Sequence, residues 1–423
     1  MPDMPRERVA VIGSGVSGLT AAYLLQRRYD VLLFEAGERL GGHAHTHDVP
    51  AGQGRSVAVD SGFIVHNRRT YPNLLRLFDE LGVRTQDSEM SMSVRCDGCG
   101  LEFAGALGLA GLFAQPRNAA NPRYLRMLAE ILRFHRHARR LLTEPDTGDT
   151  TLGAFLAIGG YSRYVIDHFV LPVVSAVWSA DRDTAKQYPA RYLFTFLDHH
   201  GLLAIGGSPT WRTVVGGSRT YVELAAKNLT AVHLGSPIRT VTRHAQGVEI
   251  RDDADTRHQA DRVVVATHPD QALALLADPT PAETRVLGAF RYSRNETVLH
   301  RDPRVLPRAA GARASWNYHK PACHSDPGAV GVSYDMNRLM RLDERGEHIV
   351  TLNGTEHIDP DQIIATMLYE HPVYTPESVA AQRELPALHT TRTAFAGAYH
   401  GWGFHEDGCA SGVRAAASLG VTW

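Results

Sequence analysis

Apolar residues gather in two short runs near the start of the chain. Residues 8–12, RVAVI, form a β-branched run of the kind that a buried parallel strand carries, and residues 31–34, VLLF, form a second run. Between the two runs, residues 18–28 carry apolar side chains at helical spacing, namely Leu19, Ala22, Tyr23 and Leu25. The pattern therefore predicts a strand, a helix and a second strand in the order of a βαβ unit.

Similar patterns return much later in the chain. Residues 234–266 alternate between apolar and polar positions and predict several strands, the last of which is the buried run at 263–266. Residues 393–420 predict a strand, a glycine-rich loop and a closing helix. The apolar runs at 169–178 and 191–197 suit either an ordinary core or the lining of a tunnel for a long chain.

Residues 122–142 form a basic amphipathic helix pattern. Its arginines are Arg123, Arg126, Arg133, Arg136, Arg139 and Arg140. Such a helix either packs its apolar face on its own domain or lies on anionic lipid, and the pattern leaves both open.

Composition narrows the class of protein. The chain has 423 residues, 43% of them hydrophobic and 21% charged, which leaves room for two globular domains. Lys+Arg 44 against Asp+Glu 45 gives a net charge of -1, so we expect no nucleic-acid partner. We find neither a signal peptide nor an apolar run near the ~18 residues of a membrane span. We therefore expect a cytoplasmic protein, with peripheral contact to the inner membrane face left open.

Four cysteines in so long a chain do not predict a disulfide framework. Cys96 and Cys99 form a C-x-x-C pair, but a zinc site needs four donors, and Cys323 and Cys409 stand alone in the sequence. We expect a hairpin turn at residues 97–98 and no metal site.

Gly13, Gly15 and Gly18 complete a G-x-G-x-x-G motif between the predicted strand and helix. Glycines at this turn let the backbone approach a pyrophosphate, which the helix N-terminus then attracts. Glu35 follows about 20 residues later, at the end of the second strand, where an acid hydrogen-bonds ribose hydroxyls. The motif in this context predicts a dinucleotide site.

Residues 41–49, GGHAHTHDV, place His43, His45 and His47 at alternating positions. On an extended chain the three rings would point to one side and could share a metal ion. The alternative is that this segment passes along the bound dinucleotide.

The segment just before these histidines favours the second interpretation. Residues 35–42, EAGERLGG, resemble the E-x-x-x-R-x-G-G segment of the FAD-dependent amine oxidase superfamily. The resemblance implies FAD as the cofactor. The implied fold class is α/β, in the form of a two-domain flavoprotein whose second domain is α+β. A discontinuous Rossmann-type FAD-binding domain would comprise residues 1–95, 231–272 and 390–423. A substrate-binding domain of mixed sheet and helices would comprise residues 96–230 and 273–389.

More specific motifs extend along nearly the whole chain. GGHAHTHDV, DSGFIVHN, TYPNL, WNY, YDMNRL and GFHEDGCASG resemble the flavoprotein-like domain that precedes the methyltransferase domain of plant cyclopropane fatty acid synthases. They also resemble bacterial flavoproteins associated with cyclopropane synthase-like enzymes. The resemblance implies such a methyltransferase as a partner and a lipid or small molecule as substrate.

The superfamily pattern assigns cofactor-binding positions across the chain. His43 replaces the usual arginine after the double glycine, and Ile238 matches the position whose backbone meets adenine. The pattern departs again at Gly397-Ala398 and at Asp407. The full set is Gly13, Gly15, Gly18, Glu35, Ala36, Arg39, Gly41, Gly42, His43, His45, Gly62, Phe63, Ile64, Ile238, Gly397, Glu406, Asp407 and Gly408.

The resemblance implies an FAD-dependent oxidoreductase. We expect a desaturase or oxidase that removes hydride from an unsaturated or methyl-branched fatty acyl chain at flavin N5, with His405, Glu406 and His43 as candidate bases. Alternatives are an oxidase or isomerase of an amine or another small molecule, and a flavin-binding partner of a lipid methyltransferase. For an amine substrate, Trp402 and Phe404 are candidate cage residues, and Lys320 is the lysine in a plausible region.

Overall fold

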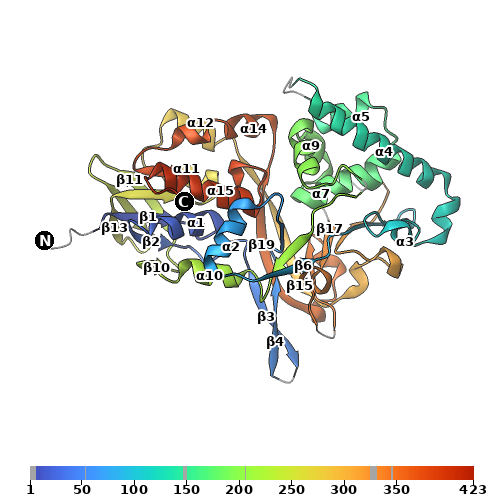
Figure 1. The fold of residues 1–423 in the computed structure, drawn as a ribbon, viewed down its shortest axis with the longest axis horizontal. Coiled ribbons are helices and arrows are strands. Elements are labelled where there is room, and N and C mark those ends of the chain that lie inside the picture. Colours follow the sequence, from blue (N-terminus) through green and yellow to red (C-terminus); the bar gives the residue numbers. More distant parts are fainter. Residues whose placement is uncertain (1–5, 53, 146–149, 205, 324–330, 344–345) are drawn as a thin grey trace.

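The computed structural model describes residues 6–52, 54–145, 150–204, 206–323, 331–343 and 346–423. Figure 1 shows a parallel sheet with its covering helices at one end of the molecule and a group of helices at the other. A second, larger sheet lies between them. The arrangement is the two-domain α/β architecture that the sequence predicts.

Five parallel strands form the first sheet, in the order β10-β2-β1-β14-β20. Their bounds are β1 (Arg8–Ile12), β2 (Asp30–Phe34), β10 (Ala231–His233), β14 (Arg262–Val265) and β20 (Thr393–Phe395). The two N-terminal strands match the predicted apolar runs. Because side chains alternate along a strand, Val9 and Val11 join the core on one face, while Ala10 and Ile12 join the core on the other.

Helices cover one face of this sheet. They are α1 (Val16–Leu25), α2 (Pro72–Leu81), α10 (Arg219–Ala226) and α15 (His405–Ser418). Glycines let α1 and α15 pack closely: a Cβ at Gly412 would lie 2.4 Å from the carbonyl oxygen of Ser17. The other face carries the antiparallel strands β11 (Ile238–Arg243), β12 (Val248–Asp252) and β13 (Arg257–Ala260), with α11 (Pro269–Leu275) and α12 (Pro281–Leu287).

The structure differs from the predicted domain limits at residues 211–226. From the sequence we expect this segment in the substrate domain. In the structure, β9 (Trp211–Val214) and α10 pack into the same core as α1, because Tyr221 and Val222 bury their side chains there. The predicted limit after residue 272 also falls inside α11, and α12 packs on the first sheet through Val286 and Leu287. The other domain limits stay a prediction.

The larger sheet has seven strands in the order β19-β15-β18-β17-β16-β7-β8. Their bounds are β7 (Met92–Cys96), β8 (Glu102–Ala104), β15 (Arg291–His300), β16 (Trp316–Lys320), β17 (Gly331–Asp335), β18 (Ile349–Leu352) and β19 (Ile363–Val373). The β7–β8 hairpin confirms the predicted turn after Cys96. A helical layer packs nearby through α3 (Gly108–Leu112), α4 (Pro122–Thr143), α5 (Leu152–Ile158), α6 (Arg163–Val165), α7 (Leu171–Trp178), α8 (Arg182–Gln187) and α9 (Ala190–His199).

Two small sheets link these units. One is the hairpin of β3 (Thr46–Gly52) and β4 (Arg55–Asp60), which projects from the body in Figure 1. The other combines β5 (Val65–Asn67), β6 (Thr85–Ser88) and β9. Two further helices are α13 (Met336–Met340) and α14 (Pro376–Gln382).

The basic helix α4 packs one face on its own domain. Tyr124, Met127 and Phe134 are buried in the core of the helical layer, whereas Leu125 and Leu132 remain 43% and 45% exposed. Contact with lipid stays a prediction. Among the residues that the structure describes, no helix combines the length and apolarity needed to cross a bilayer.

Candidate active site

The glycine turn leaves space at the start of α1. Gly13 has φ +98°, and a Cβ there would lie 2.7 Å from the Ala266 carbonyl oxygen. A Cβ at Gly18 would lie 1.9 Å from the Gly13 carbonyl oxygen, so both positions need glycine for packing. Gly15 differs, because nothing lies within 4 Å of its Cβ position. The helix N-terminus therefore opens onto free space beside Gly15, as an anion site requires.

Glu35 contacts this turn at Ser14. Its carboxylate accepts hydrogen bonds from the backbone N–H groups of Ser14 (3.0 Å) and Gly37 (2.8 Å). Its own carbonyl accepts from Ser236 N–H at 2.9 Å, which brings the strand that starts at Ile238 alongside. The expected ribose and adenine positions therefore lie together, with Ala36 exposed next to them.

The double glycine crosses directly over the turn. Gly41 and Gly42 have φ of +107° and +57°, and a Cβ at Gly42 would lie 3.2 Å from Gly15 Cα. The Arg39 guanidinium donates to the carbonyl oxygens of Gly42 (2.6 Å) and Ala44 (3.2 Å). Arg39 thus fixes the turn that holds the double glycine against the helix N-terminus.

His43 places a ring nitrogen, Nε2, in this region. Among the described residues its buried Nε2 has no hydrogen-bond partner. Its ring lies 4.9 Å from that of Tyr369 and 5.4 Å from that of His371, between centroids. Burial, followed by the neighbouring His371, lowers its pKa well below the usual value, so the ring is neutral at pH 7. A neutral imidazole whose buried nitrogen has no partner among the described residues is suited to hydrogen-bond a bound cofactor.

The segment after His43 is held by close backbone contacts. A Cβ at Gly62 would lie 2.1 Å from the His43 carbonyl oxygen, and Phe63 N–H donates to that oxygen at 2.7 Å. Ile64 is buried in the core beside the seven-stranded sheet. Gly62 is therefore required for the contact between the two chain segments.

His45 and His47 do not join His43 in one group. Their rings contact each other at 4.0 Å between centroids, in a tilted arrangement. His45 Nδ1 lies 3.0 Å from the Tyr369 hydroxyl, and His47 Nε2 lies 2.9 Å from the Ser61 hydroxyl. Burial lowers the pKa of His45 to about 3. These contacts assign His45 and His47 to a hydroxyl network.

His405 begins α15 at the other end of the site. Its ring stacks on Phe63 at 3.7 Å between centroids, and its Nε2 lies 3.0 Å from the Tyr221 hydroxyl. Burial lowers its pKa to about 3, so it is neutral at pH 7. A neutral imidazole can accept a proton, but this nitrogen already has a partner.

Glu406 is engaged in capping. Its carboxylate accepts from the backbone N–H groups of Asn73 and Leu74, both at 3.0 Å, and from the Asn73 side chain at 2.6 Å. These N–H groups belong to the first turn of α2, whose N-cap Tyr71 provides no side-chain bond. The geometry assigns Glu406 to that helix start, and a role as base stays a prediction without support here.

Asp407 also bonds to backbone. It accepts from Phe404 N–H at 2.9 Å, while burial raises its pKa to about 7. Gly397 N–H donates to the Ser411 hydroxyl at 2.9 Å, and a Cβ at Gly408 would lie 2.6 Å from Val16. These contacts fix the loop before α15 and bring its N-terminus against the start of α1.

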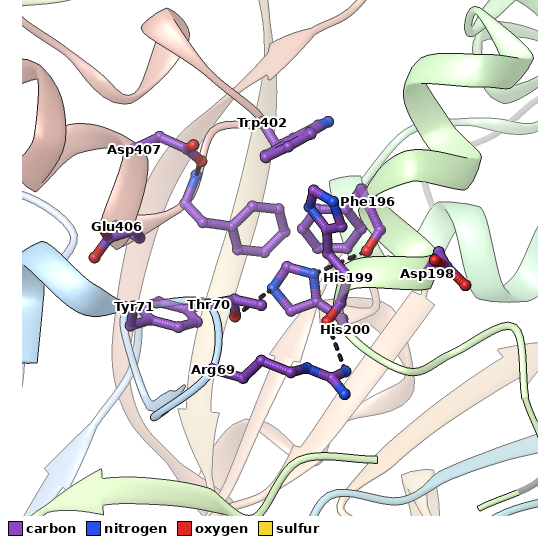
Figure 2. Close-up of a pocket in the computed structure, with 11 residues that line it drawn as sticks. Arg69, Thr70, Tyr71, Phe196, Asp198, His199, His200, Trp402, Glu406 and Asp407 are labelled. Atoms are coloured by element: carbon purple, nitrogen blue, oxygen red, sulfur yellow. Dashed lines mark hydrogen bonds between the residues drawn. The ribbon is translucent and has the colours of Figure 1, made fainter. Parts of the chain in front are cut away.

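A pocket of about 450 Å³ opens beside the α15 N-terminus (Figure 2). Phe196 and Phe404 stack at 4.6 Å between centroids. Arg69 lies at the pocket and donates to the carbonyl oxygen of His199 at 2.6 Å. The lining consists of Arg69, Thr70, Tyr71, Phe196, Asp198, His199, His200, Trp402, Phe404, Glu406 and Asp407.

Several site residues were not identified from the sequence. Tyr369 and His371 contact His43 from β19, and His200 lines the pocket. Tyr369 and His371 lie two positions apart and therefore share one face of β19. The sequence signal that could have identified them is this alternation of polar rings along the strand. Lys320 lies elsewhere, buried at the end of β16 beside Cys96.

Comparison with known proteins agrees with this geometry. The family model described as flavin containing amine oxidoreductase matches residues 16–306. The chain is 24% identical over 284 residues to (S)-6-hydroxynicotine oxidase of Paenarthrobacter nicotinovorans, an alignment covering 65% of this chain and 63% of that protein. It therefore spans less than two thirds of that relative's length.

Solved structures share the fold across the chain. Cyclohexylamine oxidase from Brevibacterium oxydans has a TM-score of 0.70 at 16% identity, covering 98% of this chain and 99% of that one. A fatty acid isomerase from P. acnes that produces CLA has a TM-score of 0.67 at 16% identity, covering 96% and 97%.

The open helix N-terminus, the double glycine above it and the His43 nitrogen, which has no partner in the described part of the chain, are together suited to a flavin dinucleotide. The chain belongs to the flavin containing amine oxidoreductase family, and its cofactor is FAD.

Proposed function

We propose that the enzyme removes hydride from an unsaturated or methyl-branched fatty acyl chain whose anionic end binds Arg69. The observation that carries the proposal is one pocket that combines an aromatic lining with Arg69, an arginine that has no carboxylate partner among the residues the structure describes. Apolar walls with a few placed polar groups are typical of sites for such ligands.

Arg69 is suited to an anionic group. Its guanidinium donates to two backbone carbonyls, His199 at 2.6 Å and Gly207 at 3.3 Å, and among the described residues it pairs with no carboxylate. These bonds hold the side chain in place and leave its charge for a ligand. Arginine binds a carboxylate or phosphate group in a fixed geometry.

The aromatic residues lead from Arg69 toward the flavin end of the site. Phe196, Trp402 and Phe404 line the pocket, and Phe404 directly precedes α15. His405, next to it, stacks on Phe63, which in turn contacts the His43 segment. An acyl chain along these rings would therefore approach the redox site while water is excluded.

Bound FAD supplies the hydride acceptor. The chain positions the substrate: Arg69 fixes the anionic end, and the rings orient an allylic carbon and tolerate the positive charge that develops as hydride leaves. His43 is neutral at pH 7 and its Nε2 has no partner among the described residues, so it is the better placed of the two histidines to accept the proton of the neighbouring carbon; His405 Nε2 already lies 3.0 Å from the Tyr221 hydroxyl.

A small amine is the second candidate substrate. Trp402 and Phe404 could surround a cation, and similar structures include cyclohexylamine oxidase. Against this, Glu406 and Asp407 are engaged by backbone N–H groups, and Figure 2 shows Asp198 apart from the aromatic rings. The fatty acid isomerase among the similar structures and the cyclopropane synthase-associated motifs support the acyl substrate.

Anaerobic flavin absorbance tests the proposal. We expect the visible absorbance band of the oxidised flavin to bleach when an unsaturated or methyl-branched acyl substrate is added. Lipid mass spectrometry should then show loss of two hydrogens. Bleaching by amines alone would favour the second candidate. Absence of bleaching, with tight binding to a cyclopropane synthase-like methyltransferase, would favour a flavin-binding partner and contradict the proposal.

Arg69→Gln tests the anion contact. We expect KM for the acyl substrate to rise about tenfold or more while kcat changes little, because a charged hydrogen bond to the ligand is lost far from the reacting carbon. Arg68→Gln is the matched control, since Arg68 is also exposed but does not line the pocket. Equal KM values for the two variants would contradict binding at Arg69.

A further inference from the structure

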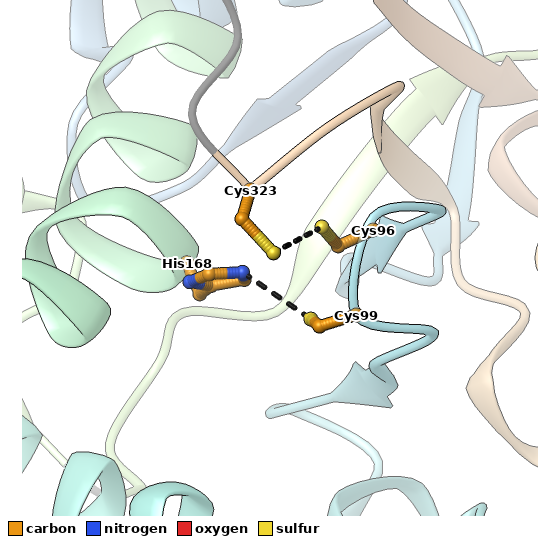
Figure 3. A group of neighbouring side chains, drawn as sticks. All are labelled: Cys96, Cys99, His168 and Cys323. Atoms are coloured by element: carbon orange, nitrogen blue, oxygen red, sulfur yellow. Dashed lines mark hydrogen bonds between the residues drawn. The ribbon is translucent and has the colours of Figure 1, made fainter.

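Three of the four cysteines and one histidine meet in the substrate domain (Figure 3). Cys96 and Cys99 come from the β7–β8 hairpin, His168 from the helical layer and Cys323 from the segment after β16. Their four ligand atoms lie within 4.8 Å of one another. The sequence interpretation of Cys323 as an isolated thiol is wrong, because folding brings it to Cys96 across 227 positions of the chain.

The spacing of these atoms matches one tetrahedral ion. Cys96 Sγ and Cys323 Sγ are 3.7 Å apart, and Cys99 Sγ and His168 Nε2 are 3.6 Å apart. With Zn–S bonds of about 2.3 Å and Zn–N bonds of about 2.0 Å, a tetrahedron requires roughly 3.8 Å between sulfurs and roughly 3.5 Å between sulfur and nitrogen. A disulfide would need sulfurs about 2.05 Å apart, so the observed separations fit coordination better.

His168 is oriented as a ligand. Its Nδ1 lies 3.0 Å from the Tyr164 carbonyl oxygen, which can only accept, so Nδ1 carries the proton and Nε2 keeps its lone pair. Metal-binding histidines are fixed in this way by their second nitrogen. The ring is 1% exposed and sits in a π-helical turn, Ile166–Val170, an irregularity frequent at functional sites.

Backbone N–H groups of the β7–β8 hairpin stabilise thiolates at Cys96 and Cys99. The backbone N–H of Cys99 donates to Cys96, and that of Leu101 donates to Cys99. Gly100, between them, has φ +69°, which favours glycine. Such N–H groups stabilise sulfur in its anionic, metal-binding form.

The geometry points to a structural zinc site formed by Cys96, Cys99, Cys323 and His168. Four protein ligands complete the tetrahedron and leave no open position for catalysis. Three thiolates, a neutral imidazole and Zn²⁺ give a charge of one negative unit, and Lys320, paired with Cys96 in the β16–β7 register, lies beside it. Cys99 also borders a small cavity of about 220 Å³, which provides an entry path for the ion.

Zinc here would join parts of the chain that are otherwise held by packing. The ligands connect the edge hairpin of the seven-stranded sheet to the helical layer at residue 168. Cys96 and Leu101 belong to the same core as Phe196, Trp402 and Phe404, which line the candidate substrate pocket. The ion would therefore stabilise the domain that contains that pocket. This inference does not depend on the identity of the substrate.

Metal analysis of the FAD-bound protein, purified without chelator, tests the site. We expect one zinc per chain, and we expect Cys99→Ser and His168→Ala to weaken zinc binding about tenfold or more. Cys409→Ala is the control, because Cys409 is buried in α15 outside the cluster and should keep full zinc content. Cobalt substitution of the wild type should give the thiolate-to-cobalt absorption of a tetrahedral site, whether or not the variants fold.

Three results would overturn the proposal. One is wild-type protein without zinc that does not take up added zinc or cobalt. Another is two titratable thiols instead of four after denaturation, which would show a disulfide. The third is full zinc content in both ligand variants. Removal of zinc by a chelator should lower Tm while the FAD absorbance is followed separately, so a failed acyl-substrate assay does not affect this test.

Discussion

At the scale of single residues, Gly42 combines an unusual backbone conformation with a position over the α1 N-terminus. We expect Gly42→Ala to weaken FAD binding about tenfold or more, because its Cβ would lie 3.2 Å from Gly15 Cα where the pyrophosphate is expected. A left-handed alanine also costs about 1 kcal/mol of stability. Equilibrium titration of apoprotein with FAD measures the affinity.

Gly160→Ala provides the matched control. Gly160 has φ +59°, close to the +57° of Gly42, and nothing lies within 4 Å of its Cβ position. It should lose similar stability and keep normal FAD affinity. Equal loss of FAD affinity in both variants would mean that backbone strain alone, and not the contact with Gly15, explains the effect.

Asp407 gives a pH dependence with a definite sign. Burial raises its pKa to about 7, above the ~3.9 of an unfolded aspartate, so its stabilising protonated form is lost as the pH rises through about 7. Wild-type stability should therefore fall relative to Asp407→Asn between about pH 4 and pH 8, by at most about 4 kcal/mol. Urea unfolding of both holoproteins across this range measures the difference, and parallel curves would contradict it.

The sequence identified residues whose role depends on local backbone geometry. Gly13, Gly15, Gly18, Gly41 and Gly42 lie where the motif predicts, because the turn is formed by neighbours in the chain. The roles of polar side chains were harder to predict. His45 bonds to a tyrosine 324 positions away, and Glu406 bonds to Asn73 across 333 positions. No local spacing encodes such contacts.

At the scale of elements, the start of α2 depends on a side chain from another helix. Glu406→Ala should destabilise the protein by about 1–2 kcal/mol, because the N–H groups of Asn73 and Leu74 lose their acceptor. Hydrogen exchange should increase at the α2 amides and stay unchanged in α14.

Glu377→Ala is the control for that prediction. Glu377 is an exposed acid in the first turn of α14, a helix that has its own cap at Thr375. Its removal should leave α2 protected from exchange. If Glu406→Ala leaves α2 equally protected and instead abolishes flavin reduction, Glu406 acts as the base and our assignment of it to capping is wrong.

Element patterns predicted the core of the fold well. The βαβ unit, the strands at residues 238–265 and the closing helix all form, because each carries its own apolar periodicity. The attachment of β9 and α10 to the first core was not predicted. Their apolar faces show that they pack, but the sequence does not say against which sheet.

At the scale of the whole molecule, FAD should stabilise both domains together. The expected cofactor site uses α1, the His43 segment, β19 and the start of α15, which belong to different cores. We expect one unfolding transition whose Tm rises with FAD concentration, because each tenfold excess of free FAD over Kd adds about 1.4 kcal/mol to the free energy of unfolding. Calorimetry of apoprotein at several FAD concentrations measures this, and a shift confined to one of two separate transitions would contradict it.

The order of strands in the five-stranded sheet has a consequence for biosynthesis. Its central strand β1 is made first, but its neighbour β14 follows only at residues 262–265, and the edge strand β20 only at residues 393–395. While the ribosome is still translating the middle of the message, the N-terminal half has unpaired strand edges that can aggregate. Fragments that stop before β20 should therefore depend on chaperones, and the finished sheet forms only close to the release of the complete polypeptide.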